Sequence, residues 1–302
     1  MKAIISTKGE LQVQQIEKPQ PENNEILVKV HAATVTAGDV VMKKMPAIAF
    51  LALQFMGMKR KRTPGHEFSG IVEAVGQDVT RFNVGDAVFG TTTGLSVGAN
   101  AEYLCLAETG KTHVITHKPE NISFEQAAAL PVGAMTALQI LQKADIQAGQ
   151  KVLVYGASGS VGTYAVQLAK YFRAEVTGVC STRNVDMLRT IGADHVIDYK
   201  EEDFTQIDKT YDVIFDAVGK LKEVNVAHLL TQTGQYLSTR TMTHEALENL
   251  NLIAQLAQKS RIKAVIDRCY PLEETADAYS YVESGRKAGN VVIFVVSRAN
   301  SL

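Results

Sequence analysis

The chain is poor in cysteine. Its 302 residues include only Cys105, Cys180 and Cys269, which lie far apart and form no CxxC pair. An odd number of widely spaced cysteines argues against a disulfide framework and against a zinc lobe held by four cysteines. The cysteine pattern therefore favours a reducing compartment, and we expect the protein to be cytoplasmic.

The sequence also lacks an excess of positive charge. It has 31 Lys and Arg residues against 32 Asp and Glu residues, for a net charge of −1. A protein that binds nucleic acid usually carries a basic footprint for the phosphates, so nucleic acid is not an expected partner. The one dense basic run, Lys59–Arg62, is interpreted as a solvated loop.

Long apolar runs are missing as well. The N-terminal residues run into polar sequence without the apolar segment of a signal peptide, and no stretch reaches the ~18 apolar residues of a membrane span. Met45–Met58 is apolar but short, and it contains Pro46 and Gln54. We interpret it as a buried or cleft-covering helix. Its basic flank leaves attachment to a membrane surface as the alternative, but membrane association is not expected.

The first part of the chain has the pattern of short β-strands. Glu25–Ala32 and Ser69–Gly76 alternate and are rich in β-branched residues, and Val84–Gly90 is a turn that leads into a short strand. Many short strands separated by glycine turns are typical of a small barrel or sandwich. The length of the chain allows a second domain with its own core.

The pattern changes near residue 121. Ser123 and Gln126 form a predicted capping box at the start of a helix, and a second helix is expected over Gly133–Lys143. Strands and helices then alternate, which predicts βαβ units and a parallel sheet. The predicted strands are Lys151–Tyr155, Glu175–Cys180, His195–Tyr199, Tyr211–Asp216 and Gly234–Thr239. Strands return at Ile262–Ile266 and Asn290–Val296, with a helix over Leu272–Ser284 between them.

A glycine-rich loop connects the first of these strands to a helix expected from Val161 to about Arg173. The loop residues are Gly156, Ala157, Ser158, Gly159, Ser160, Val161 and Gly162, an AxGxxG variant of the dinucleotide fingerprint. Glycine lets the backbone approach a pyrophosphate, and the start of the helix offers unpaired N–H groups and a positive dipole end. The strand–loop–helix context predicts a dinucleotide site rather than an ordinary glycine turn.

The end of the second strand predicts which dinucleotide is bound. Enzymes that bind NAD place Asp or Glu there to bond the ribose hydroxyls. Here the strand leads into Ser181, Thr182 and Arg183, without a carboxylate. Arginine can pair with a 2′-phosphate that a carboxylate would repel, so NADPH is the predicted cofactor. The alternative is that Arg183 is only a solvated residue at a helix start.

Several motifs along nearly the whole chain now identify a resemblance. They are Pro64–Val72, Val84–Gly90, Ala127–Pro131, Gly156–Gly162, Leu188–Tyr199, Phe215–Gly219, Val265–Arg268 and Gly289–Val292. The chain resembles the zinc-independent quinone oxidoreductases of the medium-chain dehydrogenase/reductase superfamily. The resemblance implies an α/β protein with a GroES-like β-rich catalytic domain, formed by residues 1–121 and 265–302, and a Rossmann domain over residues 122–264. It also implies that the active site lies in a cleft between them, and that Tyr199, Ala217 and Val218 join the loop in binding the cofactor.

The zinc-dependent members of this superfamily bind their catalytic metal with cysteine, histidine and a further cysteine, next to a glutamate. His66 and Glu67 match the histidine–glutamate pair, but Thr36 occupies the position of the first cysteine and no cysteine lies near Pro131. Zinc needs three or four suitable ligands, so no metal is expected. Asn100 also departs from relatives, which often have tyrosine at that position.

Without a Lewis acid, the chemistry favours acceptors that are already activated. We therefore expect hydride transfer from NADPH to a quinone or an α,β-unsaturated carbonyl. Thr36, Asp39 and His66 are expected to border the site, although no residue stands out as a general acid.

A shortened segment leaves an alternative open. Only Arg240–Thr243 separate the strand ending at Thr239 from a helix expected near His244, where relatives have a further strand at the usual dimer edge. The protein is thus expected to be a monomer or a homodimer. An NADPH-binding sensor or interaction module with little turnover is the second hypothesis.

Overall fold

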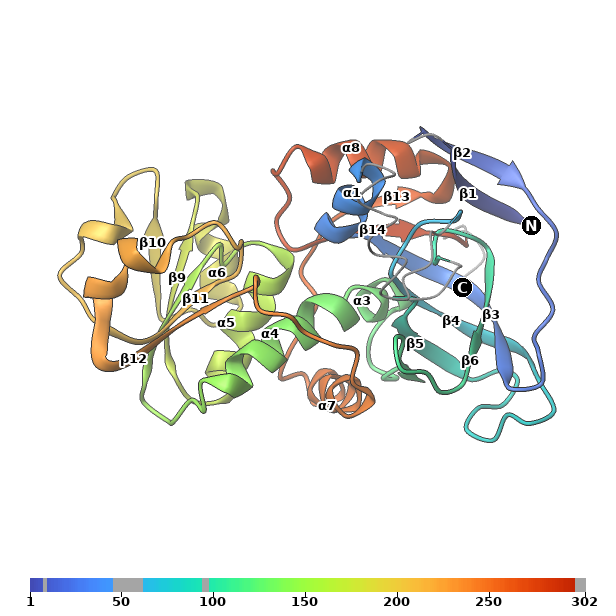
Figure 1. Ribbon diagram of the computed structural model, residues 1–302, viewed down its shortest axis with the longest axis horizontal. Helices are drawn as coiled ribbons and strands as arrows, with labels where there is room; N and C mark the ends of the chain where they lie inside the picture. The colour runs from blue at the N-terminus through green and yellow to red at the C-terminus, as the bar shows by residue number, and fades with distance from the viewer. Residues whose placement is uncertain (8–9, 46–61, 94–97, 297–302) are drawn as a thin grey trace. The chain divides into compact units, whose positions relative to one another are not determined.

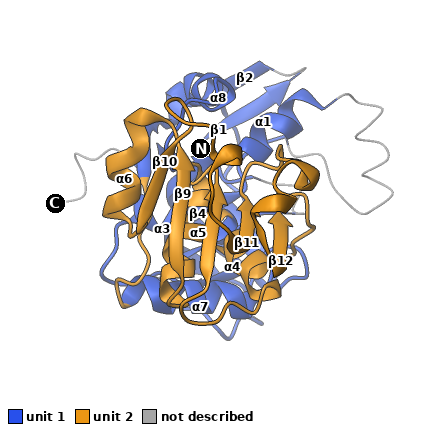
Figure 2. Ribbon diagram, turned by 90° about the vertical axis from the view of Figure 1, so that its left-hand side faces the viewer, with its two compact units in different colours: residues 1–132, 245–258, 266–302 blue, residues 133–244, 259–265 orange. Residues whose placement is uncertain are grey.

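The computed structural model describes residues 1–7, 10–45, 62–93 and 98–296 (Figure 1). The chain divides into two compact units, coloured separately in Figure 2. Unit 1 comprises residues 1–132, 245–258 and 266–302, and unit 2 comprises residues 133–244 and 259–265. Unit 1 is therefore built from early and late parts of the chain, with unit 2 inserted. The helix expected in Met45–Met58 and the run Lys59–Arg62 lie almost entirely outside the described residues.

Unit 1 is β-rich, as predicted. Its main sheet has the strand order β13-β14-β3-β4-β5-β7, with β6 paired to β3, and β1 and β2 form a separate hairpin. The strands are β1 (Lys2–Thr7), β2 (Glu10–Gln15), β3 (Glu25–Val35), β4 (Glu67–Val75), β5 (Ala87–Thr91), β6 (Tyr103–Ala107), β7 (Ile115–His117), β13 (Ile266–Pro271) and β14 (Asn290–Phe294). The helices are α1 (Ala37–Lys44), α3 (Phe124–Ala128), α7 (Leu247–Gln258) and α8 (Thr275–Glu283).

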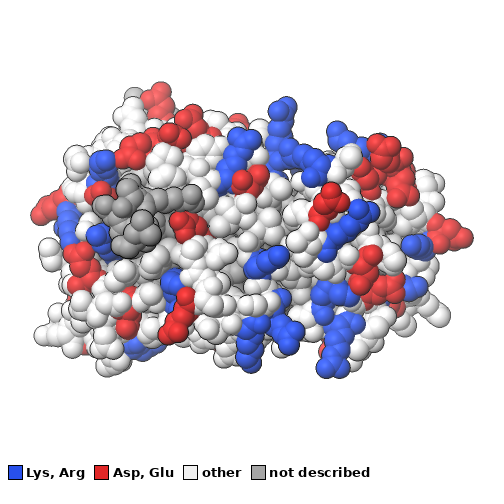
Figure 3. Space-filling view, turned by 180° about the vertical axis from the view of Figure 1, so that it is seen from behind, with Lys and Arg blue, Asp and Glu red and all other residues white. Residues whose placement is uncertain are grey.

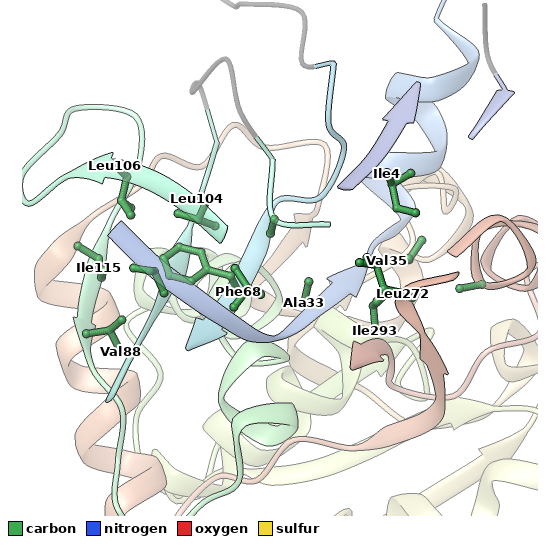
Figure 4. Packing of buried hydrophobic residues seen from close by; sticks show 14 of the residues in the cluster. Ile4, Ala33, Val35, Phe68, Val88, Leu104, Leu106, Ile115, Leu272 and Ile293 are labelled. Carbon is green, nitrogen blue, oxygen red and sulfur yellow. The ribbon is translucent and has the colours of Figure 1, made fainter. Parts of the chain in front are cut away.

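The core of unit 1 lies between its strands (Figure 4). Phe68 of β4, Leu104 of β6 and Ile115 of β7 belong to one cluster of buried side chains, each at most 1% exposed. Ile293 of β14 and Leu272 before α8 belong to the same cluster. Burial of such side chains stabilises the fold by about 1.5–3 kcal/mol each. The cluster fixes β3 and β4, and two residues discussed below, Thr34 and Glu67, lie on these strands.

Helix α3 begins with the capping box predicted from the sequence. Ser123 Oγ accepts a 3.2 Å hydrogen bond from Gln126 N, and Gln126 Oε1 accepts a 2.9 Å bond from Ser123 N. The carbonyl oxygen of Phe124 accepts a 2.6 Å hydrogen bond from Ser69 Oγ of β4. The helix is thereby fixed to the sheet of unit 1.

Unit 2 is a parallel sheet with the order β10-β9-β8-β11-β12. Its strands are β8 (Lys151–Tyr155), β9 (Glu175–Cys180), β10 (His195–Asp198), β11 (Tyr211–Asp216) and β12 (Leu230–Ser238). Helix α4 (Pro131–Lys143) begins at the end of the first segment of unit 1, α5 (Ser160–Tyr171) packs on β8 and β9, and α6 (Val185–Thr190) packs on β10. β8, β9 and β11 are confirmed to the residue. Their central positions explain this, because a strand buried on both faces is nearly continuously apolar.

Several predicted elements have other bounds in the structure. β12, for example, begins at Leu230 and not at Gly234. The strand expected over Ile262–Ile266 is wrong, because β13 begins only at Ile266 and continues to Pro271. β13 is an edge strand with exposed Asp267 and Arg268, so it lacks the apolar alternation used to predict it. The helix expected near His244 begins at Leu247, and no strand occurs in residues 239–246. No helix in the described ranges combines the length and apolar character needed to cross a membrane.

Candidate active site

The glycine-rich loop of unit 2 leaves β8 and enters α5. Gly156 has φ +73°, and a Cβ on it would lie 2.2 Å from Val218 Cγ2. A Cβ on Gly162 would lie 2.2 Å from Gly156 O. Both glycines are therefore required by the packing of the loop itself. Ala157 is fully buried, and its N–H donates a 3.1 Å hydrogen bond to Val179 O of β9, so this side chain fits where the usual fingerprint has glycine.

Gly159 differs from its neighbours. It has an extended backbone with φ −77°, and the one atom that its Cβ would meet within 4 Å is Gly156 O, at an ordinary 3.4 Å. The protein itself therefore leaves room for a side chain at this position. Gly159 is also the N-cap residue of α5, and as a glycine it has no side chain that could accept a hydrogen bond from the first turn of the helix. The first-turn N–H groups of a helix have no acceptor within the helix and favour an anion. The loop thus fits the pyrophosphate of a dinucleotide.

The turn after β11 lies directly beside this loop. Ala217 N donates a 3.0 Å hydrogen bond to Tyr155 O, and the Val218 side chain occupies the space next to Gly156. The buried carboxylate of Asp216 shapes the turn, because it accepts hydrogen bonds of 2.8–2.9 Å from the N–H groups of Val218, Gly219 and Leu221. Two segments predicted to bind the cofactor, Gly156–Gly162 and Ala217–Val218, therefore meet at one edge of the sheet.

The ends of β9 and β10 meet at the same edge. Asp198 pairs with Cys180 in the parallel register, and Tyr199 N donates a 3.0 Å hydrogen bond to Cys180 O. Arg183 lies exposed in the short 3₁₀ turn Thr182–Asn184, and Tyr199 is exposed as well. The carboxyl edge of a parallel sheet is where such folds bind ligands. A hollow of about 370 Å³ lies beside the end of β10, lined by Tyr155 and residues 199–204.

Asp198 was not predicted as a site residue, yet it contacts the end of β9. Its carboxylate accepts hydrogen bonds from the hydroxyl and the backbone N–H of Thr182 and from Lys200 N, and the bond from the Thr182 side chain is the main reason why its pKa is lowered. Thr182 is therefore already engaged by a carboxylate on the neighbouring strand. The signal that could have indicated this contact is the parallel pairing of the two strands, which places the end of β10 beside the end of β9.

A second cluster of polar residues lies in unit 1, at the start of α1 and β4. Thr36 is the N-cap of α1, and its backbone N–H and hydroxyl donate to Asp39 Oδ2 at 2.8 and 2.6 Å. The other oxygen, Asp39 Oδ1, lies 2.5 Å from His66 Nδ1. The structure therefore brings the three residues predicted to border the site into one hydrogen-bonded network. Their catalytic role stays a prediction.

Glu67 lies beside this network. It is 1% exposed, and its carboxyl group accepts hydrogen bonds from Thr34 Oγ1 of β3 and, at 2.6 Å, from Val132 N in the first turn of α4. Burial raises the pKa of Glu67 to about 7, against the lowering effect of these hydrogen bonds. Lys287, which no sequence motif indicated, lies close enough to Glu67 to interact with its charge, and burial lowers the pKa of Lys287 to about 8.

The donor set of this cluster does not fit a zinc site. Thr36 and His66 Nδ1 are both engaged by Asp39. Within the described ranges, no three or more His, Cys, Asp or Glu side chains are grouped so that they could hold a metal ion. A catalytic zinc needs three protein ligands, and the described residues do not supply them.

Comparison with known proteins places this geometry in a family. Residues 22–119 match the alcohol dehydrogenase GroES-like domain, and residues 160–266 match the family described as zinc-binding dehydrogenase. The chain is 31% identical to a 2-methylene-furan-3-one reductase of Solanum lycopersicum, over 91% of this chain and 73% of that protein. It is 29% identical to an NADPH-dependent alkenal/one oxidoreductase of Arabidopsis thaliana, over 98% of this chain and 80% of that protein.

The fold comparison agrees with the sequence comparison. The solved quinone oxidoreductase of Coxiella burnetii is similar with a TM-score of 0.85 and 29% identity, covering 98% of this chain and 99% of that one. The GroES-like unit, the parallel-sheet unit and the glycine loop all belong to one type of nicotinamide-dependent oxidoreductase. The chain is therefore a member of the medium-chain dehydrogenase/reductase superfamily, in its quinone oxidoreductase-like branch.

Proposed function

We propose that the protein is an NADPH-dependent reductase that transfers hydride to a quinone or an α,β-unsaturated carbonyl without zinc. The observation that carries this proposal is the free space beside Gly159, at the start of α5, together with exposed Arg183 at the end of the neighbouring strand β9. Relatives named as an alkenal/one oxidoreductase and a 2-methylene-furan-3-one reductase support the acceptor class. A monomer or homodimer in the cytoplasm is part of the proposal.

The preference for NADPH rests on the charges at the end of β9. Arg183 is exposed and can pair with a 2′-phosphate through charge-assisted hydrogen bonds. Asp198 would oppose this phosphate, but Thr182 and Lys200 N already donate to its carboxylate. The remaining cofactor contacts proposed are the loop Gly156–Gly162, Ser181 and Thr182, and Tyr199, Ala217 and Val218.

The proposed mechanism uses no metal because the described side chains around His66 do not supply the three ligands that a catalytic zinc needs. When bound, the dinucleotide supplies a hydride. The protein binds and orients the two reactants, which lowers the barrier by several kcal/mol through proximity alone. No Lewis acid is required if the acceptor is already polarised, as a quinone or an enone is. On the face in Figure 3, acidic and basic side chains are interspersed, which fits a small-molecule substrate better than nucleic acid.

One observation favours a second function, an NADPH-binding sensor or interaction module with little turnover. Residues 239–246 hold no strand, so β12 is the last strand on its side of the sheet. Relatives have a further strand at this edge, and its absence here can leave the reactants less firmly positioned. A displacement of ~1 Å in the position of the reactants can cost about 100-fold in rate, which would leave a protein that binds NADPH with little turnover.

A single assay separates the two functions. NADPH absorbance is followed with a panel of quinones and enones, and NADPH binding is measured in parallel by calorimetry. The reductase predicts saturable oxidation of NADPH by at least one acceptor, with no added metal and with chelator present. Binding without oxidation by any acceptor assigns the sensor function instead, and no binding contradicts both.

A further inference from the structure

The hydrogen bonds around Asp39 determine where His66 carries its proton. Burial opposes the ionisation of Asp39, but the charge and hydrogen bond of His66 and the bonds from Thr36 outweigh it, so the pKa of Asp39 is lowered. The carboxylate is therefore ionised at neutral pH and has no proton to donate. The hydrogen atom in the 2.5 Å contact must then belong to His66 Nδ1. The neutral ring is held as the Nδ1–H tautomer, and Nε2 is the atom that gains or loses a proton.

Nε2 is left for another partner. It makes no hydrogen bond to any residue in the described part of the chain. The His66 side chain is 20% exposed, whereas that of Asp39 is 1% exposed. One side of the pair is thus fixed in the protein interior, while the ring keeps access to solvent. A buried carboxylate that orients a histidine through Nδ1 is a common arrangement of acid–base catalysts.

Other ionisable groups face this pair from several elements. Glu67 of β4 and Glu245, just before α7, both interact with the His66 charge, and Tyr279 of α8 interacts with that of Asp39. Lys287 interacts in turn with Glu67. Thr91 Oγ1 donates a 3.0 Å hydrogen bond to Glu245. The described groups that interact with this pair are therefore two carboxyl groups and a tyrosine, with a lysine beside Glu67.

We propose that His66 is the catalytic proton donor of the reductase and that Asp39 is its positioning residue. This inference rests on the proposed function, because the proton is delivered to the oxyanion that hydride transfer creates. It assigns the acid that no sequence motif identified.

The reduction of an enone consumes one hydride and one proton. The dinucleotide, when bound, would supply the hydride that forms a C–H bond at the β-carbon of the enone, and it would thereby be the reductant. The C=C electron pair moves so that negative charge develops on the carbonyl oxygen. The Nε2–H bond of cationic His66 then breaks and an O–H bond forms. This transfer leaves the ring neutral, with Nδ1–H still donated to Asp39. The enol then relaxes to the saturated carbonyl, and solvent returns a proton to Nε2.

The tautomer can be tested without any turnover. ¹⁵N NMR of histidine-labelled protein resolves the ring nitrogens, and the His66→Gln variant assigns the His66 signals. We expect the neutral ring to carry its proton on Nδ1 in the wild type. A neutral ring protonated on Nε2 overturns the inference, whether or not the protein reduces any acceptor.

Kinetics test the transfer itself. For an enone acceptor, we expect His66→Gln to lower kcat at least about 100-fold, while the Kd for NADPH stays within about threefold. The wild-type kcat should fall with rising pH through one ionisation, and this ionisation should be missing in His66→Gln. Asp39→Asn should lower kcat and displace the same ionisation. The matched control is His117→Gln, since His117 forms an exposed pair with Asp86 in the same unit and should leave kcat unchanged.

The outcomes separate the two proposals. A wild type that binds NADPH but reduces no acceptor overturns the proposed function and this inference together. An active wild type with His66→Gln equally active, or with its pH profile retained, overturns only the role of His66. One zinc per chain in the wild type that is lost in His66→Gln would also overturn it, because the ring would then be a ligand.

Discussion

The carboxyl group of Glu67 accepts a 2.6 Å hydrogen bond from the backbone N–H of Val132. Glu67 begins β4 and Val132 lies in the first turn of α4, so this bond joins two segments that are 65 residues apart. The first turn of a helix favours a negative charge, yet burial works against that charge. Burial dominates, and it raises the pKa of Glu67 to about 7.

Glu67 should therefore make stability depend on pH. Because its folded-state pKa lies above the ordinary 4.5, the folded protein holds this proton more tightly than the unfolded chain. The stability it contributes is present below pH ~4.5 and is lost as the pH rises to about 7, a change on the order of 3 kcal/mol. Glu67→Gln should remove this dependence and be the more stable form at pH 7. Denaturant unfolding at pH 4.5, 6 and 7 measures it, and Glu248→Gln, at an exposed position of α7, should leave the wild-type slope intact.

The glycines of the loop predict a contrast between two variants. Gly159→Ala should fold normally, since its Cβ meets only one atom at 3.4 Å, but the methyl group should block the pyrophosphate and weaken NADPH binding at least about tenfold. Gly162→Ala should instead lower Tm, because its Cβ would lie 2.2 Å from Gly156 O. Calorimetry and thermal unfolding test both. Undiminished NADPH affinity in Gly159→Ala would place the pyrophosphate elsewhere.

Arg183→Ala should raise the KM for NADPH by about 10-fold or more and leave the KM for NADH almost unchanged. The reason is the loss of a charge-assisted hydrogen bond to the 2′-phosphate. Steady-state kinetics with both dinucleotides measure the effect. Arg189→Ala is the matched control, because Arg189 is exposed and pairs with Asp186 on the same helix. Equal changes for both cofactors would assign ribose recognition to Asp198 instead.

Asn100 predicts a stabilising substitution. The side chain is fully buried, and neither its Nδ2 nor its Oδ1 makes a hydrogen bond within the described structure. A buried amide without partners costs about 1–3 kcal/mol. Asn100→Leu keeps the number and branching of the side-chain heavy atoms and removes the polar ones, so it should raise Tm by a few degrees in a thermal melt. A lower Tm would show that the amide has a partner that the substitution removes.

Much of unit 2 was predictable because its signals are local. β8, β9 and β11 are buried runs bounded by turns, and the unit of strand, glycine loop, helix and second strand is contained in residues 151–180. The capping box at Ser123 is equally local, since both of its partners lie within four residues. β13 was predicted at the wrong residues because an edge strand with exposed Asp267 and Arg268 shows no alternation of apolar and polar residues.

The contacts of the candidate site depend on pairings that the sequence pattern does not show. Asp39 and His66 are 27 residues apart, and the segment between them includes residues outside the described structure. Asp198 reaches Thr182 because β9 and β10 are parallel in one particular register. Lys287 follows α8, and only the folded chain brings it near Glu67. Thr36, Asp39 and His66 could be named from the sequence, but their partners could not, and neither Asp198 nor Lys287 was identified as a site residue.

The three backbone bonds to Asp216 have a consequence for how a dinucleotide would associate. Because the carboxylate fixes Val218, Gly219 and Leu221 together, the turn after β11 is already ordered before the ligand arrives. Little conformational entropy is then left to lose at that turn on binding. Association should follow simple second-order kinetics there, without a slow rearrangement step, and Asp216→Asn should introduce one.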